Sequence, residues 1–114
     1  MAFSEYLADR IRQNLDDKHL SYVDKKMMGG LTFMIDDKMC VGIIKDDLLA
    51  RINPDIYESS LEKEGCKEMK FTGRPMKGFV LIEAEAIDDD ADLDYWIQLC
   101  LDFNPLAKSS KKKK

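Results

Sequence analysis

The chain has 114 residues, enough for one domain, and 45% of them are apolar, which supports a core without metals or disulfides. Its apolar runs are far too short to span a membrane and acidic residues interrupt the N-terminal segment, so we expect a cytoplasmic protein with no membrane contact. Of the 18 Lys and Arg residues, five lie in the last seven positions; the remaining 13 face 22 acidic residues, a net charge of −9 that disfavours nucleic-acid binding by the body of the protein.

An amphipathic helix is predicted over residues 4–17. Apolar side chains recur there at four-residue steps, at Phe3, Leu7, Ile11 and Leu15. Ser4 stands where an N-cap is expected, because its hydroxyl can accept a hydrogen bond from the first helical turn. Further on, Gly29 and Gly30 interrupt regular structure and indicate a turn or the entry of a strand.

Three short apolar runs then predict an antiparallel meander, since apolar and polar residues alternate and acidic turns separate the runs. The turns are Asp36-Asp37 and Asp46-Asp47. The middle run, residues 39–44, is apolar on both faces, because Cys40, Gly42 and Ile44 occupy the alternate positions. Something must therefore cover both sides of this strand: helices cover one, and a partner subunit is a candidate for the other.

A second helix is predicted over residues 54–64. Asn53 can cap it, Pro54 suits the first helical position because proline has no N–H to satisfy, and Gly65 is a natural terminator.

A second hairpin and a last helix complete the chain. Residues 69–72 and 79–84 alternate as strands on either side of a basic loop at residues 73–78. The last helix begins in the acidic run 88–94 and continues to about Phe103. Its apolar residues have helical spacing, at Leu93, Trp96, Ile97, Cys100 and Leu101.

The predicted order is helix, three strands, helix, two strands, helix. This order is typical of an α+β domain with an antiparallel sheet, here of about five strands. Residues 1–106 form the single domain, and residues 107–114 form a lysine-rich tail that we expect to be disordered, because it has nothing to bury.

Cysteine and histidine content argues against a metal site and a catalytic dyad. Cys40, Cys66 and Cys100 are odd in number and widely spaced, and His19 is the only histidine. No third group that would orient a Cys66–His19 pair is indicated. We therefore expect three reduced, mostly buried thiols.

Other motifs for cofactors fail as well. The alternating aspartates Asp88, Asp90, Asp92 and Asp94 begin like a calcium loop, but Leu93 and Leu99 stand where glycine and a bidentate glutamate are needed. The glycine pair has neither nucleotide-binding signature. We expect acidic residues at a helix N-terminus instead, and a protein with no enzymatic activity, cofactor or metal.

One internal segment opposes the acidic charge of the body. Residues 67–78 hold four basic residues and one acidic residue. Lys70, Arg74 and Lys77 are therefore candidate partner-binding residues, with Arg74 as a fork-shaped donor to a phosphate or an acidic partner helix. The alternative is that Arg74 pairs with carboxylates of its own chain.

Two separated motifs carry a family resemblance. The first is Lys26-Met27-Met28-Gly29-Gly30 before a strand, and the second is Gly73-Arg74-Pro75-Met76 in the later hairpin. With these motifs in this order, residues 3–103 resemble the N-terminal domain of the TfoX/Sxy competence regulators, here as a free-standing domain. In that family an aromatic residue usually stands at the position of Met28.

The resemblance implies an α+β fold similar to secretion chaperones, in a bacterial protein. It also implies a link to DNA-uptake competence, where full-length members act with the cyclic-AMP receptor protein as transcriptional coactivators. It carries over no catalytic residue, so the motif glycines and Pro75 can be architectural.

We therefore predict a non-enzymatic regulatory module that binds a protein partner, with self-association into a homodimer as the simplest version. An exposed sheet face and the Arg74 loop are the expected contact surfaces. The alternative is accessory nucleic-acid binding through the basic loop and the lysine tail.

Overall fold

The computed structural model describes residues 4–27, 30–71 and 73–107. These residues form a six-stranded antiparallel sheet in the order β1-β2-β3-β4-β6-β5. The strands are β1 (Val23–Met27), β2 (Gly30–Ile35), β3 (Lys38–Ile44), β4 (Asp47–Arg51), β5 (Cys66–Phe71) and β6 (Arg74–Ile82). The helices are α1 (Glu5–Asp17), α2 (Tyr57–Leu61) and α3 (Asp90–Phe103), with 3-10 turns at Pro54–Ile56, Ala84–Ile87 and Asn104–Leu106. The predicted α+β class is confirmed. Of the predicted lysine-rich tail at residues 107–114, Ala107 is described and is buried, and residues 108–114 lie outside the described residues.

The described sheet has one strand more than the sequence predicts, because β1 has almost no apolar residues. The side chains from Val23 to Lys26 are all exposed. β1 pairs with β2 from Val23 opposite Met34 to Met27 opposite Gly30, so backbone hydrogen bonding defines it. Charged edge strands of this kind protect a sheet from further strand pairing.

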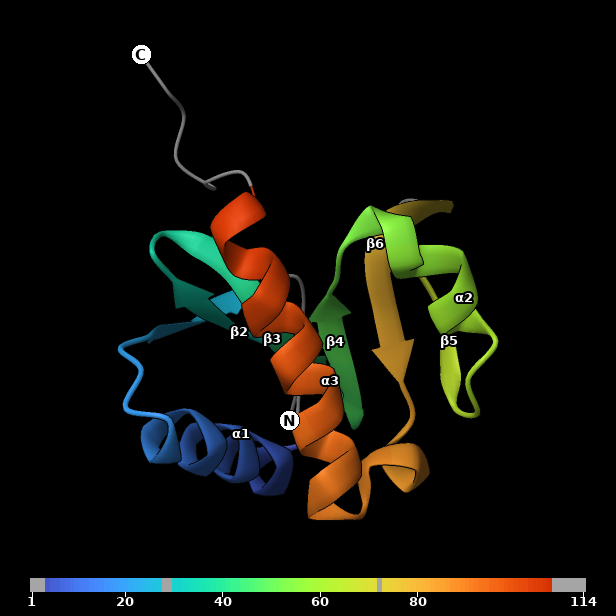
Figure 1. Cartoon of the computed structure of the whole chain (residues 1–114). Coiled ribbons are helices and arrows are strands. Elements are labelled where there is room, and N and C mark those ends of the chain that lie inside the picture. The colour runs from blue at the N-terminus through green and yellow to red at the C-terminus, as the bar shows by residue number, and fades with distance from the viewer. Residues whose placement is uncertain (1–3, 28–29, 72, 108–114) are drawn as a thin grey trace.

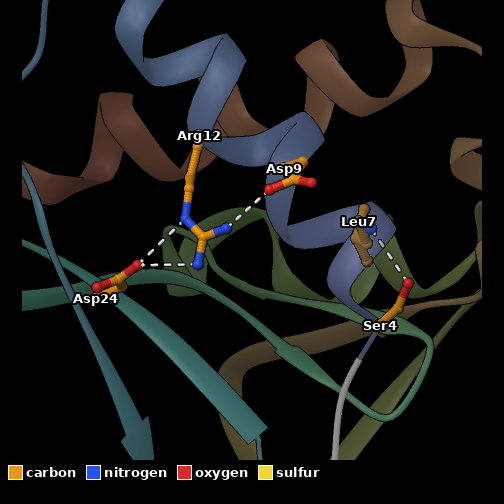
Figure 2. A network of polar contacts seen from close by, with 5 residues as sticks. All are labelled: Ser4, Leu7, Asp9, Arg12 and Asp24. Carbon is orange, nitrogen blue, oxygen red and sulfur yellow. Dashed lines mark hydrogen bonds and ion pairs between the residues drawn. The ribbon is translucent and has the colours of Figure 1, made fainter.

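Helix α1 forms as predicted. The Ser4 hydroxyl oxygen accepts a hydrogen bond from the backbone N–H of Leu7 at 3.2 Å, as Figure 2 shows. Of the predicted stripe, Leu7, Ile11 and Leu15 are buried against the sheet, and Phe3 lies outside the described residues. The N-cap satisfies a backbone donor that would otherwise lack a partner, and the stripe supplies the packing energy.

An arginine joins α1 to the edge of the sheet. Arg12 lies between Asp24 of β1, at 3.2 Å, and Asp9 of its own helix, at 2.9 Å (Figure 2). Partial burial alone would lower the pKa of Arg12, but hydrogen bonds and ion pairs with the two carboxylates outweigh it and raise that pKa. The contact fixes the otherwise polar edge strand to the helix.

The second helical segment is shorter than predicted. The caps are as expected: the side-chain oxygen of Asn53 accepts from the N–H of Asp55 at 2.9 Å, and Gly65 has a positive φ of 79°. Between them the chain makes one 3-10 turn and then the short α2. Tyr57 and Ser60 are its buried residues.

The helices pack on one side of the sheet, and α3 crosses in front of β3 and β4 in Figure 1. Under them lies the main core. One cross-strand row of this core joins Phe33, Val41, Ala50 and Val80, all 0% exposed. Trp96 and Ile97 of α3 complete it from above.

A bulge in β3 changes which side chains face the helices. Phe33 stands opposite Val41 and Met34 opposite Met39, so Cys40 is an extra residue between the two pairs. Cys40 therefore joins the main core, and Met39 turns to the other face. The expectation that Cys40 shares a face with Gly42 and Ile44 is wrong for this reason.

Candidate functional site

The other side of the sheet carries a second apolar cluster, which we call the helix-free face. Its buried members are Met34, Met39, Leu49 and Met69, and its partly buried members are Ile44, Phe79 and Leu81. All seven come from strands, and no helix of the described chain contributes a side chain to the cluster. One row across the strands runs Lys25, Thr32, Gly42, Leu49, Leu81 and Lys67, with a lysine on each edge strand.

Apolar side chains in this position are unusual. An antiparallel sheet with helices on one side normally shows polar residues on the other. The predicted burial of β3 on both sides is confirmed, and Met34, Met39, Leu49 and Met69 are only 2–8% exposed. Ile44, Phe79 and Leu81 keep more accessible area, so a molecule that approaches this face meets them first.

Lys67 lies at the β5 edge of this face and is tied to its own chain. Its ammonium is 3.2 Å from a carboxylate oxygen of Asp47 and 3.6 Å from one of Glu83. The hydrogen bond and ion pair with Asp47 raise the pKa of Lys67. Lys67 of the basic segment therefore pairs with carboxylates of its own chain.

Arg51 marks the other border of the face, at the end of β4. Its guanidinium carbon lies 5.4 Å from the ring centroid of Phe79 and 5.9 Å from that of Phe103. One guanidinium nitrogen donates to the carbonyl oxygen of Met39 at 3.4 Å. Burial lowers the pKa of Arg51. A cation stacked on aromatic rings holds the α3 end against the sheet and contributes positive charge beside the apolar cluster.

The three predicted partner-binding residues lie on the β5–β6 hairpin. Lys70 stands opposite Pro75, and Phe71 stands opposite Arg74. Lys77 is exposed. The side chains of Lys70 and Arg74 lie outside what the structure describes, so their role in binding stays a prediction.

The motif glycines have two different physical roles. A Cβ on Gly30 would lie 1.9 Å from the carbonyl oxygen of Ile43, because β2 and β3 approach closely there. Gly73 instead has a positive φ of 82°, and a Cβ added there would meet nothing within 4 Å. Both roles are architectural.

The remaining motif residues add little to a site. Lys26 is exposed on β1. Gly29 lies outside the described residues, as do the side chains of Met27, Pro75 and Met76.

The structure separates Cys66 and His19, the candidate nucleophile and base. Cys66 begins β5 at one edge of the sheet, whereas the chain passes from His19 into β1 at the opposite edge. Burial raises the pKa of Cys66 to about 11 and that of Cys40 to about 12. It also raises the pKa of Cys100. These thiols stay protonated at neutral pH, which makes them poor nucleophiles.

The acidic run serves α3, as predicted. The side chain of Asp89 accepts from the N–H of Ala91 at 3.0 Å and caps the helix. Asp90 pairs with Arg10 at 2.9 Å. Among the described residues no three His, Cys, Asp or Glu side chains gather as a metal site.

Asp94 joins α3 to α1. It accepts a hydrogen bond from the side-chain amide of Asn14 at 2.9 Å and pairs with Lys18. The hydrogen bonds from Lys18 and Asn14 lower the pKa of Asp94. This pair therefore stabilises the fold when Asp94 is ionised.

Replacing the Asp94 carboxylate tests how much its contacts between α3 and α1 stabilise the fold. Asp94→Asn should lower the free energy of unfolding at neutral pH by about 0.5 kcal/mol, since half-exposed pairs are screened by water. Because the folded-state pKa is depressed, the difference from the native protein is present above pH ~4 and disappears as the pH falls through that pKa. Urea unfolding at several pH values measures it. Asp46→Asn, a change of equal charge at an exposed residue between β3 and β4, is the control; a pH-independent difference for Asp94→Asn would contradict the account.

Comparison with known families agrees with the sequence motifs and with this fold. The TfoX N-terminal domain matches residues 17–104, which include every described strand and α3. The chain belongs to the TfoX N-terminal domain family. This family places it among competence-related regulatory domains. No curated protein and no solved structure matched the chain.

The family match covers both architectural glycines of this TfoX N-terminal domain, Gly30 and Gly73. It also covers the whole helix-free face and begins at the last residue of α1. In the described part of the domain, no helix has the length and apolar character needed to cross a membrane.

Proposed function

We propose that this TfoX N-terminal domain is a non-enzymatic regulatory module that binds a protein partner through its helix-free face. The observation that carries the proposal is the cluster of seven apolar side chains on the side of the sheet to which no described helix contributes. Partly exposed Ile44, Phe79 and Leu81 would make the first contacts. Apolar surface of this kind on a sheet is typical of protein interfaces.

The composition of the face suits an adaptable interface. Three of its side chains, Met34, Met39 and Met69, are methionines, whose flexible thioethers repack against partners of different shape. Burial of Phe79 and Leu81 by a partner would add to the binding energy at the centre of the contact.

The charges around the face favour an acidic partner surface. Lys25 ends its central row on β1, Arg51 borders it, and Lys77 is exposed on the neighbouring hairpin. These cations lie on a chain whose net charge is −4. A segment that combines apolar and acidic side chains complements such a surface, and a second copy of this acidic chain is one molecule of that kind.

Gel filtration with matched variants tests the proposal. The tagged chain in a cell extract should elute earlier than its 13.1 kDa monomer, and Leu81→Glu should return it to the monomer position, because a buried carboxylate opposes docking. Tyr6→Glu is the control, since Tyr6 is 70% exposed on α1. Early elution of the purified protein identifies a second copy as the partner; early elution only in the extract identifies another protein.

Either elution result supports docking only if Leu81→Glu removes it and Tyr6→Glu does not. Monomer elution of the unmodified chain in both samples would overturn the proposal. So would a Leu81→Glu protein that is folded by circular dichroism and still elutes with the complex.

A further inference from the structure

A separate cavity lies on the helical side of the molecule, where the end of α2, the turn Ala84–Ile87 and the start of α3 meet. Its volume is about 640 Å³, within the range of sites that hold small ligands. The residues that line it are Lys63, Glu64, Gly65, Glu83, Glu85, Ala86, Asp92, Tyr95 and Trp96. None of them belongs to the helix-free face.

The walls of the cavity carry excess negative charge. Glu64, Glu83, Glu85 and Asp92 contribute four carboxylates, against one ammonium from Lys63. Glu83 shares Lys67 with Asp47, whereas the other three carboxylates form no ion pair with any described residue. Unpaired carboxylates around a concavity favour a cationic ligand.

An aromatic wall of the cavity already holds a cation. Tyr95 is 42% exposed, and the ammonium nitrogen of Lys63 lies 5.0 Å from its ring centroid. Trp96 packs against Tyr95 edge to face, with the ring centroids 5.2 Å apart. The Tyr95 ring is thus held in place, and the exposed Lys63 can swing away to leave its position to an incoming ammonium or guanidinium group.

Trp96 adds a hydrogen-bond donor to the residues around the cavity. Its side chain lines the cavity although the residue is only 4% exposed. No described residue accepts a hydrogen bond from its indole Nε1–H. This atom is not among the fully buried polar atoms that lack a partner, so it keeps some contact with solvent. An acceptor on a ligand in the cavity, such as a carbonyl oxygen, can therefore replace water as the partner of this donor.

We propose that this cavity binds a basic segment of a polypeptide. A lysine or arginine side chain lies against Tyr95 among the carboxylates, and a backbone carbonyl of the same segment accepts from Trp96. A peptide is the ligand class that presents a long-stemmed cation and a neutral acceptor together. The site is distinct from the helix-free face, so the domain can hold two polypeptide segments at once.

The single tryptophan of the chain gives a direct readout. In a proton–nitrogen spectrum of the full chain, the one indole Nε1–H signal should shift saturably when a short, end-blocked lysine peptide is added. The same peptide with glutamine in place of lysine should leave the signal in place. Tyr95→Ala should weaken binding about fivefold, Tyr95→Phe should retain it, and added salt should weaken it.

Controls separate the cavity from general charge attraction. Tyr6→Ala removes another exposed ring that carries a cation, Arg10, and should bind the lysine peptide as the native protein does. If Tyr95→Ala is not folded, Glu85→Gln replaces it, because Glu85 is exposed. A shift of the indole signal on dilution of the protein alone would show that a lysine segment of a second copy occupies the cavity, which also supports the proposal.

Three results would overturn this assignment. The first is an indole signal that does not move even at millimolar lysine peptide. The second is an equal shift with the glutamine peptide. The third is unchanged affinity in folded Tyr95→Ala and Glu85→Gln proteins.

Discussion

Gly30→Ala should lower the free energy of unfolding by about 3 kcal/mol, a large overpacking effect. The added Cβ would lie 1.9 Å from the carbonyl oxygen of Ile43, and this oxygen belongs to the backbone of the neighbouring strand. A side chain could rotate away from the methyl group, but a paired strand must shift as a whole. Urea unfolding followed by circular dichroism measures the loss.

Gly73→Ala is the matched control, because it adds the same methyl group at the other motif glycine. A Cβ there meets nothing within 4 Å, and only the positive φ of 82° opposes it. We expect a loss of about 1 kcal/mol for that conformation. If Gly30→Ala cost no more than Gly73→Ala, the close approach of β2 and β3 would not be the reason for glycine at position 30.

Phe33→Ala should cost about 4 kcal/mol of unfolding free energy. The ring is 0% exposed in the main core, in the same row as Val41. Tyr22 packs on its edge with ring centroids 5.7 Å apart, and Arg12 lies 6.0 Å from its ring centroid. Removing it leaves a cavity beneath α1 that rigid neighbours cannot fill. Thermal and urea unfolding measure the effect.

Phe79→Ala makes the same change on the helix-free face. Phe79 is only partly buried, so its loss should cost about 1.5 kcal/mol, well below the cost of Phe33→Ala. Equal losses at the two positions would mean that the helix-free face is as tightly packed as the main core. It would then be structural, and docking there would be contradicted.

Apolar patterns and capping residues within single elements made much of the fold predictable. The apolar stripe and Ser4 cap predicted α1, and Asn53 and Gly65 marked the ends of the second helical segment. Strand β1 was missed because backbone pairing at a sheet edge leaves no apolar pattern in Val23–Met27. The bulge at Cys40 was missed because it depends on the register between two strands, which no single strand encodes.

The candidate surfaces also differ in how far each could be predicted from the sequence. The alternate apolar positions of β3 predicted that both sides of the sheet would be covered, and the structure places Ile44 on the helix-free face. The basic segment was visible as well, but its Lys67 pairs with Asp47. The cavity beside Trp96 was not predictable, because its walls come from three separate stretches of chain that meet only in the folded domain.

Photo-crosslinking from the helix-free face tests partner docking most directly. A benzophenone amino acid in place of Leu81 should give, in cells, a covalent adduct with one defined polypeptide, attached at a segment with apolar and acidic residues. Ile44→Glu in the same chain should abolish this adduct, and the same probe in place of exposed Tyr6 should not form it. Adducts of the same kind from both probe positions, or an adduct that survives Ile44→Glu in a folded protein, would contradict docking at this face.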